Sequence, residues 1–176
     1  MATTTIRPGL SVLVAGVRDV VARREPAART ARLVADVLRA RLPGPGILDP
    51  AERVGDPAHY VQHVLHVEPG GSFSIVGLVW LPGQVTPIHD HVAWCVFGVL
   101  QGAENETLYR VEGDHLVVAG AAENRVGEVS GFAPPGDIHR VRNSGTDTAI
   151  SLHVYGADIG DLGNSVRRIY DLPVRG

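Results

Sequence analysis

The sequence predicts an all-β domain of the sandwich or barrel type, preceded by two α-helices. Beyond Gly46 the chain consists of short β-type runs separated by Gly, Pro, Asn and Asp, with no helical pattern between them. Before Gly46, apolar residues recur at intervals of three and four, which is typical of amphipathic helices. A length of 176 residues with 44% hydrophobic residues suits one domain that buries about 70% of the surface of its unfolded chain.

The first helix is predicted over about residues 11–24 and the second over about residues 27–42. Pro26 suits the first turn of the second helix, and the Pro-Gly-Pro-Gly sequence at 43–46 ends it. We expect residues 1–46 to form a helical segment packed on a barrel of residues 47–176, within a single structural domain.

Eight β-strands are predicted after the helices. Their expected ranges are residues 60–67, 72–80, 93–100, 104–111, 115–119, 125–129, 139–143 and 149–155. The tail that follows, residues 160–176, is expected to pack back over a mouth of the barrel.

Composition excludes several classes of function. The net charge is −3 and the arginines are scattered among acidic residues, so no basic surface for nucleic acid is expected. The apolar stretch near the N-terminus is interrupted by Arg18 and Asp19, and no apolar run reaches the roughly 18 to 20 residues of a membrane-spanning helix. We therefore expect a cytoplasmic protein with no leader and no membrane partner. Cys95 is the only cysteine, so an internal disulfide is impossible.

Three histidines predict a metal site. His89 and His91 are two residues apart, and a β-strand directs both side chains to one face. His139 follows a Pro-Pro-Gly turn. Three neutral imidazoles bind a borderline-soft divalent ion and leave coordination positions open for chemistry. Zinc also accepts three histidines, so this pattern does not by itself select the metal.

Two motifs around these histidines resemble those of the cupin proteins. The first is a glycine, five residues, His-x-His and a closing glycine, here Gly83, His89, His91 and Gly102. The second is Pro-x-Gly-x-x-His-x-x-x-Asn, here Pro134, Gly136, His139 and Asn143. The resemblance implies a cupin double-stranded β-helix, which is a jelly-roll barrel. Cupins usually have a glutamate ligand four or five residues after the second histidine, and here Cys95 holds that place.

From about residue 60 to residue 155 the chain resembles the cysteine dioxygenase family of cupin thiol dioxygenases. The strand Ser151-Leu-His153-Val-Tyr155 is similar to the Ser-x-His-x-Tyr relay of that family. The resemblance implies an Fe(II) site of three histidines, with Ser151, His153 and Tyr155 as catalytic residues. A spacing of two places the three side chains on one strand face, where they can form a hydrogen-bonded row.

The His-x-His motif and the strands that precede it, residues 60–66 and 73–94, are most similar to the bacterial 3-mercaptopropionate dioxygenase type. That type has glutamine where animal cysteine-type members have arginine. Gln62 stands there in this chain. The bacterial type places its carboxylate-binding arginine where this chain has Asn164, so Arg167 or Arg168 is the candidate for that role. Cys95 with Tyr155 forms a possible thioether crosslink, as in animal members, and a free buried thiol is the alternative.

The predicted function is an iron-dependent thiol dioxygenase of sulfur metabolism, which converts a small thiol (3-mercaptopropionate or cysteine-like) and O₂ to the sulfinate. Alternatives are the same chemistry on another thiol or a thione such as ergothioneine, a non-catalytic metal-binding cupin sensor, and a zinc or manganese cupin hydrolase or isomerase. The expected partners are small molecules only, and the oligomeric state is left open.

Overall fold

The computed structural model of the chain describes residue 7 and residues 9–175. The helices are α1 (Leu10–Val21), α2 (Ala27–Ala40) and α3 (Ile159–Leu162), with a 3₁₀ turn, η1 (Pro45–Ile47), after α2. The strands are β1 (Val61–Val67), β2 (Ser74–Trp80), β3 (His89–His91), β4 (Cys95–Gln101), β5 (Ala103–Glu112), β6 (His115–Arg125), β7 (Val129–Phe132), β8 (His139–Arg142), β9 (Ala149–Tyr155), β10 (Val166–Ile169) and β11 (Val174–Arg175).

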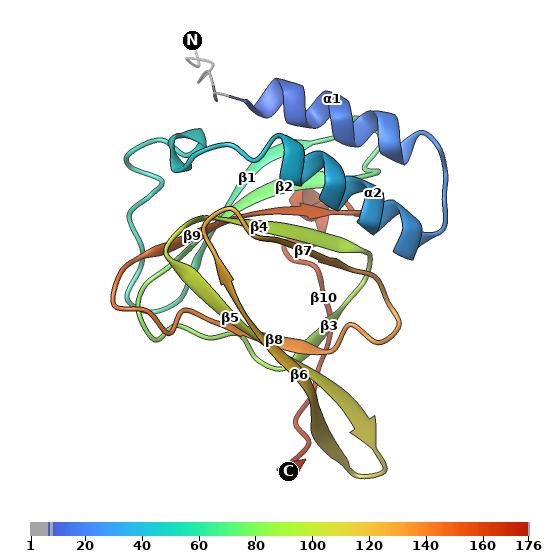
Figure 1. The fold of residues 1–176 in the computed structure, drawn as a ribbon, viewed down its shortest axis with the longest axis vertical. Helices are drawn as coiled ribbons and strands as arrows, with labels where there is room; N and C mark the ends of the chain where they lie inside the picture. Colours follow the sequence, from blue (N-terminus) through green and yellow to red (C-terminus); the bar gives the residue numbers. More distant parts are fainter. Residues whose placement is uncertain (1–6, 8, 176) are drawn as a thin grey trace.

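The strands form two sheets that face each other (Figure 1). One has the order β1-β2-β9-β4-β7 and the other the order β10-β3-β8-β5-β6-β11. All pairings are antiparallel except that of β11 with β6. The predicted all-β barrel with two N-terminal helices is confirmed.

Helices α1 and α2 cover the outer side of the five-stranded sheet (Figure 1). Their apolar residues, such as Leu13 and Leu38, share one core cluster with Ile75 and Val79 of β2. The alternate residues of β2, Val76 and Leu78, belong to a second cluster between the sheets. Because both faces of this sheet are covered, every residue of β2 and β9 is buried.

The predicted helices are slightly longer than the observed ones. The first ends at Val21 instead of residue 24, and the second ends at Ala40 instead of residue 42. Pro26 is the residue that precedes the first turn of α2, not part of that turn. Its carbonyl oxygen accepts hydrogen bonds from the amides of Arg29 and Thr30, so Pro26 still provides an acceptor for amides of the first turn of the helix.

The separate strands predicted at residues 115–119 and 125–129 are wrong. One strand, β6, runs from His115 to Arg125, and β7 begins at Val129. Gly120 does not end the strand because β5 pairs with β6 along its whole length, with a register shift between Leu108 and Tyr109 that accommodates the mismatch.

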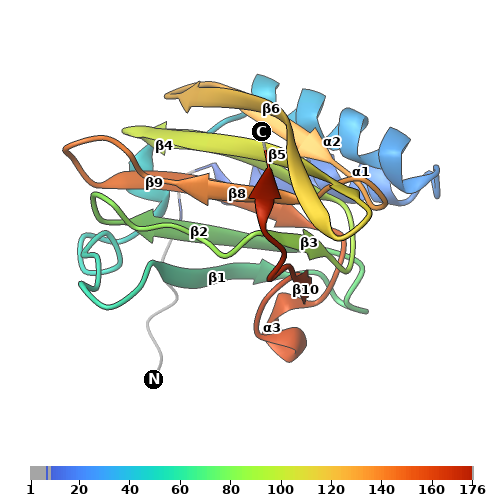
Figure 2. The ribbon, with the colours of Figure 1, turned by 90° about the horizontal axis from the view of Figure 1, so that it is seen from below.

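The tail, which was expected to pack over a mouth of the barrel, folds back onto β3, the strand that carries His89 and His91. After α3, strand β10 pairs with β3, and Figures 1 and 2 both place these two strands side by side. Ile169 lies opposite His89 and Val166 opposite His91. The helices in the described part of the chain all lack the length and apolar character that crossing a membrane requires.

Candidate metal centre

Three histidine side chains meet between the sheets. His89 and His91 both project from β3 to the same side, and His139 begins β8, directly opposite His89. All three are buried, and their ligand nitrogens lie within 4.8 Å of one another. The predicted set of His89, His91 and His139 is therefore brought together as one cluster.

The second nitrogen of each ring has an acceptor. Nδ1 of His89 lies 2.9 Å from the carbonyl oxygen of Pro87, which can only accept, so this nitrogen donates. Nδ1 of His91 lies 3.1 Å from Oδ2 of Asp137, and Nδ1 of His139 lies 2.6 Å from Oε1 of Glu106. This pattern leaves the Nε2 lone pairs available, and it is typical of histidines that bind a metal. The residues present therefore fit a divalent metal ion.

The surroundings of His89 and His91 keep these two rings neutral, as metal binding requires. Burial, with the neighbouring imidazoles, lowers the pKa of His89 to about 3. Burial also lowers the pKa of His91. Hydrogen bonds from the ring and the amide of His91 hold the pKa of Asp137 below its ordinary value, although burial opposes them.

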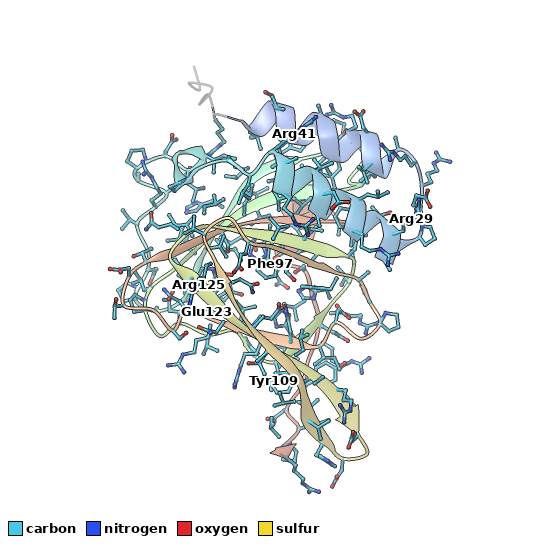
Figure 3. The ribbon with its side chains drawn as sticks, in the orientation of Figure 1. Arg29, Arg41, Phe97, Tyr109, Glu123 and Arg125 are labelled. Carbon is cyan, nitrogen blue, oxygen red and sulfur yellow. The ribbon has the colours of Figure 1, made fainter. Side chains whose placement is uncertain are left out.

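A hydrogen-bonded row on β9 leads to this cluster. Oγ of Ser151 lies 2.9 Å from Nε2 of His153, and the hydroxyl of Tyr155 lies 3.1 Å from Nδ1 of the same ring. Burial lowers the pKa of His153 to about 3 and raises that of Tyr155 well above its ordinary value, so both side chains stay neutral. Phe97, labelled in Figure 3, stacks on His153 with ring centroids 5.2 Å apart. The predicted row is thus present as a geometric feature.

Cys95 lies next to this row. It is directly opposite Tyr155 on the adjacent strand, and its Sγ is 3.9 Å from Nδ1 of His153. Burial raises the pKa of its thiol. The two residues of the predicted crosslink are therefore cross-strand neighbours, and the crosslink itself stays a prediction.

One cavity, with about 450 Å³ of empty space that is partly open to solvent, joins these groups. Its walls come from both sheets and from the tail. The lining residues are Tyr60, Gln62, Leu78, Trp80, Thr86, His89, His91, Cys95, His139, Val141, His153, Tyr155, Asn164, Ser165 and Val166.

Among the predicted substrate contacts, only Gln62 lines this cavity, and its Nε2 donates to the carbonyl oxygen of Gly163 at 2.8 Å. Arg167 is paired with Asp90, and Arg168 lies over the ring of Tyr170, 5.4 Å from its centroid. Both arginines line a neighbouring surface pocket that shares Tyr60, Asn164 and Val166 with the cavity. Their role in substrate binding stays a prediction.

The sequence analysis missed several residues of the site. Glu106 and Asp137 support two of the histidines, and Tyr60 stacks on Trp80 at a centroid distance of 4.3 Å. A signal for Glu106 exists, because Glu104 and Glu106 alternate in a predicted strand and so share a face. Asp137 precedes His139 by two residues within the second motif.

Curated proteins with similar sequences include two mammalian cysteine dioxygenases. The chain is 32% identical to human cysteine dioxygenase type 1 over 90 residues, which cover 48% of this chain and 45% of the human protein. The rat protein is 31% identical over the same length. The match thus spans about half the length of these curated relatives.

This chain also resembles a solved structure, and that likeness concerns the fold alone. It is an uncharacterized conserved protein with a double-stranded β-helix domain from Klebsiella pneumoniae, 18% identical, with a TM-score of 0.50 over 63% of this chain and 84% of that one.

The sequence model of cysteine dioxygenase type I matches residues 47–161, which is more than half of the chain. This chain therefore belongs to the cysteine dioxygenase type I family.

Proposed function

We propose that this protein is an iron(II)-dependent thiol dioxygenase, which adds both atoms of O₂ to a small thiol and releases the sulfinate. One observation supports this function most directly: three buried imidazoles and a hydrogen-bonded Ser-His-Tyr row line the same cavity. Membership of the cysteine dioxygenase family supports the same reaction class.

His89, His91 and His139 would hold the iron. A bound ferrous ion would supply open positions at which the thiol and O₂ are held together and activated. Because the three ligands are neutral, the donor set favours an anionic thiolate over a neutral donor.

Ser151, His153 and Tyr155 are the proposed catalytic residues. The Tyr155 side chain lines the cavity, and burial keeps its phenol protonated. His153 contacts both the Tyr155 hydroxyl and the Ser151 hydroxyl, so its orientation is fixed at both ring nitrogens. In this position Tyr155 can orient a reactant by a hydrogen bond and exchange a proton with it.

The cavity lining favours a thiol without an α-amino group. None of the described residues that line it is Asp or Glu, so the ammonium group of cysteine would find no anionic partner there. We therefore propose 3-mercaptopropionate as the substrate, ahead of cysteine.

Gln62 is proposed to contact the polar end of the substrate, and an arginine from the adjoining pocket is proposed to bind its carboxylate. Arg168 is the better candidate, because Arg167 is already paired with the buried Asp90. No ion pair of Arg168 is found in the described part of the chain, and it lies beside Asn164 and Tyr60, which the two pockets share.

The Cys95–Tyr155 pair is proposed to form a thioether during turnover. The new C–S bond replaces the S–H bond and one ring C–H bond, and O₂ takes up the two electrons and two protons. Peptide mapping by mass spectrometry should find the two peptides linked, with two hydrogens fewer than their sum. A free thiol in enzyme that has turned over would exclude this crosslink.

The function is tested by loading the protein with iron under anaerobic conditions and recording thiol-dependent O₂ uptake. The panel contains 3-mercaptopropionate, cysteine, cysteamine, mercaptosuccinate and ergothioneine, and the matched control is His139→Ala. We expect fastest uptake with 3-mercaptopropionate and none in the control. Uptake with ergothioneine alone would assign a thione substrate, and bound metal without uptake from any compound would favour a sensor.

A further inference from the structure

Glu104 is a buried carboxyl that the proposed reaction does not use. It lies on β5, two residues before Glu106, and its side chain is 0% exposed inside the barrel. Neither of its carboxyl oxygens has a hydrogen-bond partner among the described residues. Burying an ionised carboxylate without a partner is costly, so its position calls for a physical explanation.

The carboxyl lies near Ser151, the member of the Ser-His-Tyr row farthest along the strand from Tyr155. The Ser151 hydroxyl and the Trp80 indole N–H are near enough to lower its pKa, while burial and Glu106 raise it, and the result is a pKa of about 7. Neither neighbour makes a hydrogen bond to the carboxyl in this structure, so a bond with Ser151 requires a small shift or one bridging water.

Other polar groups also face this carboxyl. Asn124 lies directly opposite Glu104 on β6, and its Nδ2 is likewise buried without a partner in the described chain. From β4, Cys95 is close enough for Glu104 to raise the pKa of its thiol, although burial has the larger effect. Glu104 therefore adjoins a polar region that spans β2, β4, β6 and β9.

The hydroxyl of Ser151 connects Glu104 to the row. It has one hydrogen and two acceptor lone pairs. Trp80 Nε1, which can only donate, lies 3.3 Å from Oγ and occupies one lone pair. The second lone pair and the single hydrogen remain for Glu104 and His153. Ionised Glu104 can only accept from Ser151, which leaves one arrangement of the row, whereas protonated Glu104 can donate to Ser151, which makes the reverse arrangement possible.

If Glu104 is protonated, it donates to Ser151, which donates to Nε2 of His153. Nδ1 then carries the hydrogen and donates to the Tyr155 oxygen, and the Tyr155 O–H points into the cavity. If Glu104 is ionised, every bond reverses. Ser151 donates to the carboxylate, Nε2 of His153 donates to Ser151, and the Tyr155 O–H is turned back towards Nδ1.

We propose that Glu104 is a positioning residue, which sets the tautomer of His153 and thereby the direction of the Tyr155 hydroxyl. Its use in turnover rests on the proposed dioxygenase function. Tyr155 gives its proton to an acceptor in the cavity and takes the Nδ1 proton. His153 takes the Ser151 proton at Nε2, and Ser151 takes the proton of Glu104. The net change is one proton moved from Glu104 to the cavity.

The tautomer is tested in the full chain, both metal-free and loaded with diamagnetic zinc. Histidine labelled with ¹⁵N distinguishes a protonated ring nitrogen from an unprotonated one, and His153→Gln assigns the signals. We expect His153 to change from the Nδ1–H to the Nε2–H form as the pH rises from about 5 to about 9. An unchanged tautomer over this range in the wild type would overturn the proposal, even if no variant folded.

Glu104→Gln should show no change of the His153 tautomer with pH, because its amide does not ionise in this range and keeps hydrogens that can be donated to Ser151. Glu123→Gln is the control, because Glu123 is an exposed carboxyl on the adjacent strand β6, and it should titrate like the wild type. If Glu104→Gln switches tautomer as the wild type does, Glu104 is not the controlling group.

Kinetics of the iron-loaded protein complete the test. Glu104→Gln should lower kcat for the thiol by about 10- to 100-fold, remove its pH dependence near neutrality, and leave KM within about twofold. A wild type without thiol-dependent O₂ uptake would refute the proposed function but not the tautomer control. An active wild type whose kcat and pH profile are unaffected by Glu104→Gln would refute the inference alone.

Discussion

At the scale of single residues, the main feature of the site is the position of its negative charges. The three candidate ligands are imidazoles, which carry no negative charge. The two carboxylates of the site, Asp137 and Glu106, accept hydrogen bonds from Nδ1 of His91 and of His139 instead of facing the metal position. Asp137 and Glu106 would thus offset the charge of a bound divalent ion without occupying a coordination position. Those positions stay available to substrates.

Glu106→Gln should weaken metal binding by about 10- to 100-fold. The substitution keeps the size of the side chain and removes the negative charge that makes His139 a stronger ligand. Competition with a chelator measures the affinity. The control is Glu123→Gln on the protein surface, where Glu123 and Arg125 lie together (Figure 3). Equal affinity in both variants would show that the contact with His139 contributes nothing to binding.

His153→Ala should leave the iron content unchanged and reduce the rate of sulfinate formation by about 10²- to 10⁴-fold. The side chain contacts Ser151 and Tyr155 and makes no hydrogen bond to a candidate ligand in the described chain. Iron analysis and product quantification on the same preparation check both parts. A proportional loss of iron would instead assign His153 a role in building the metal site.

Short-range spacing in the sequence predicts part of this site. His-x-His and Ser-x-His-x-Tyr are each defined within one strand, where a period of two fixes which side chains lie together. Spacing indicates which face of its strand Glu106 lies on, but it cannot give the contact with His139, because the two residues meet diagonally across two strands whose register places Leu108 opposite His139. Register of this kind depends on the whole sheet.

At the scale of elements, the five-stranded sheet depends on close contact at its outer face. Gly77 lies in the middle of β2, and a Cβ added there would be 2.7 Å from Cδ2 of the fully buried Leu48. The segment after α2 can therefore pack on the sheet only where a side chain is missing.

Gly77→Ala should lower the free energy of unfolding by about 1–3 kcal/mol, because Leu48 must move within a packed core. Gly120→Ala is the matched control, since Gly120 is also in a strand but a Cβ there meets only a side-chain atom 3.8 Å away. The control should be neutral or slightly stabilising. Urea unfolding of both variants gives the comparison, and equal stabilities would mean that Leu48 adjusts at no cost.

Elements differ in how well the sequence predicts them. Strand β9 matches its predicted range of 149–155, because its alternating apolar and polar residues are bounded on both sides by turn residues. Strand β10 has four residues, three of them exposed, and it exists because β3 offers it a partner. A short strand of that kind has no periodic signal of its own.

At the scale of the whole molecule, the tail is held against β3 by the pairing of β10 with that strand and by one buried carboxylate. Asp90 accepts hydrogen bonds from Arg167 and from the Tyr170 hydroxyl, the latter at 2.9 Å. Asp90 lies between the two histidines of β3, so the same three-residue strand carries two candidate ligands and the anchor of the tail. The wall of the cavity formed by residues 164–166 therefore depends on this contact.

An ion pair between Arg7 and Glu52 also holds the start of the described chain against the segment that leads into the barrel. Arg7 donates to both carboxylate oxygens of Glu52, at 2.7 and 2.8 Å, and to the carbonyl oxygen of Ile47. The hydrogen bond from Arg7 holds the pKa of Glu52 at about 2, below its ordinary 4.5, although partial burial opposes it. A carboxyl whose pKa is lower in the folded state stabilises the fold while it is ionised.

This pair should therefore contribute about 1–2 kcal/mol to the free energy of unfolding above about pH 4.5, after allowance for its partial exposure. The contribution should be lost as the pH falls towards about 2, because protonated Glu52 no longer attracts Arg7. Urea unfolding of the wild type and of Glu52→Gln over this range measures the difference. The difference should shrink with acid, whereas Glu123→Gln should match the wild type throughout, since Glu123 and Arg125 are a solvent-exposed pair. A difference for Glu52→Gln that does not depend on pH would mean that shape, not charge, holds this segment to the barrel.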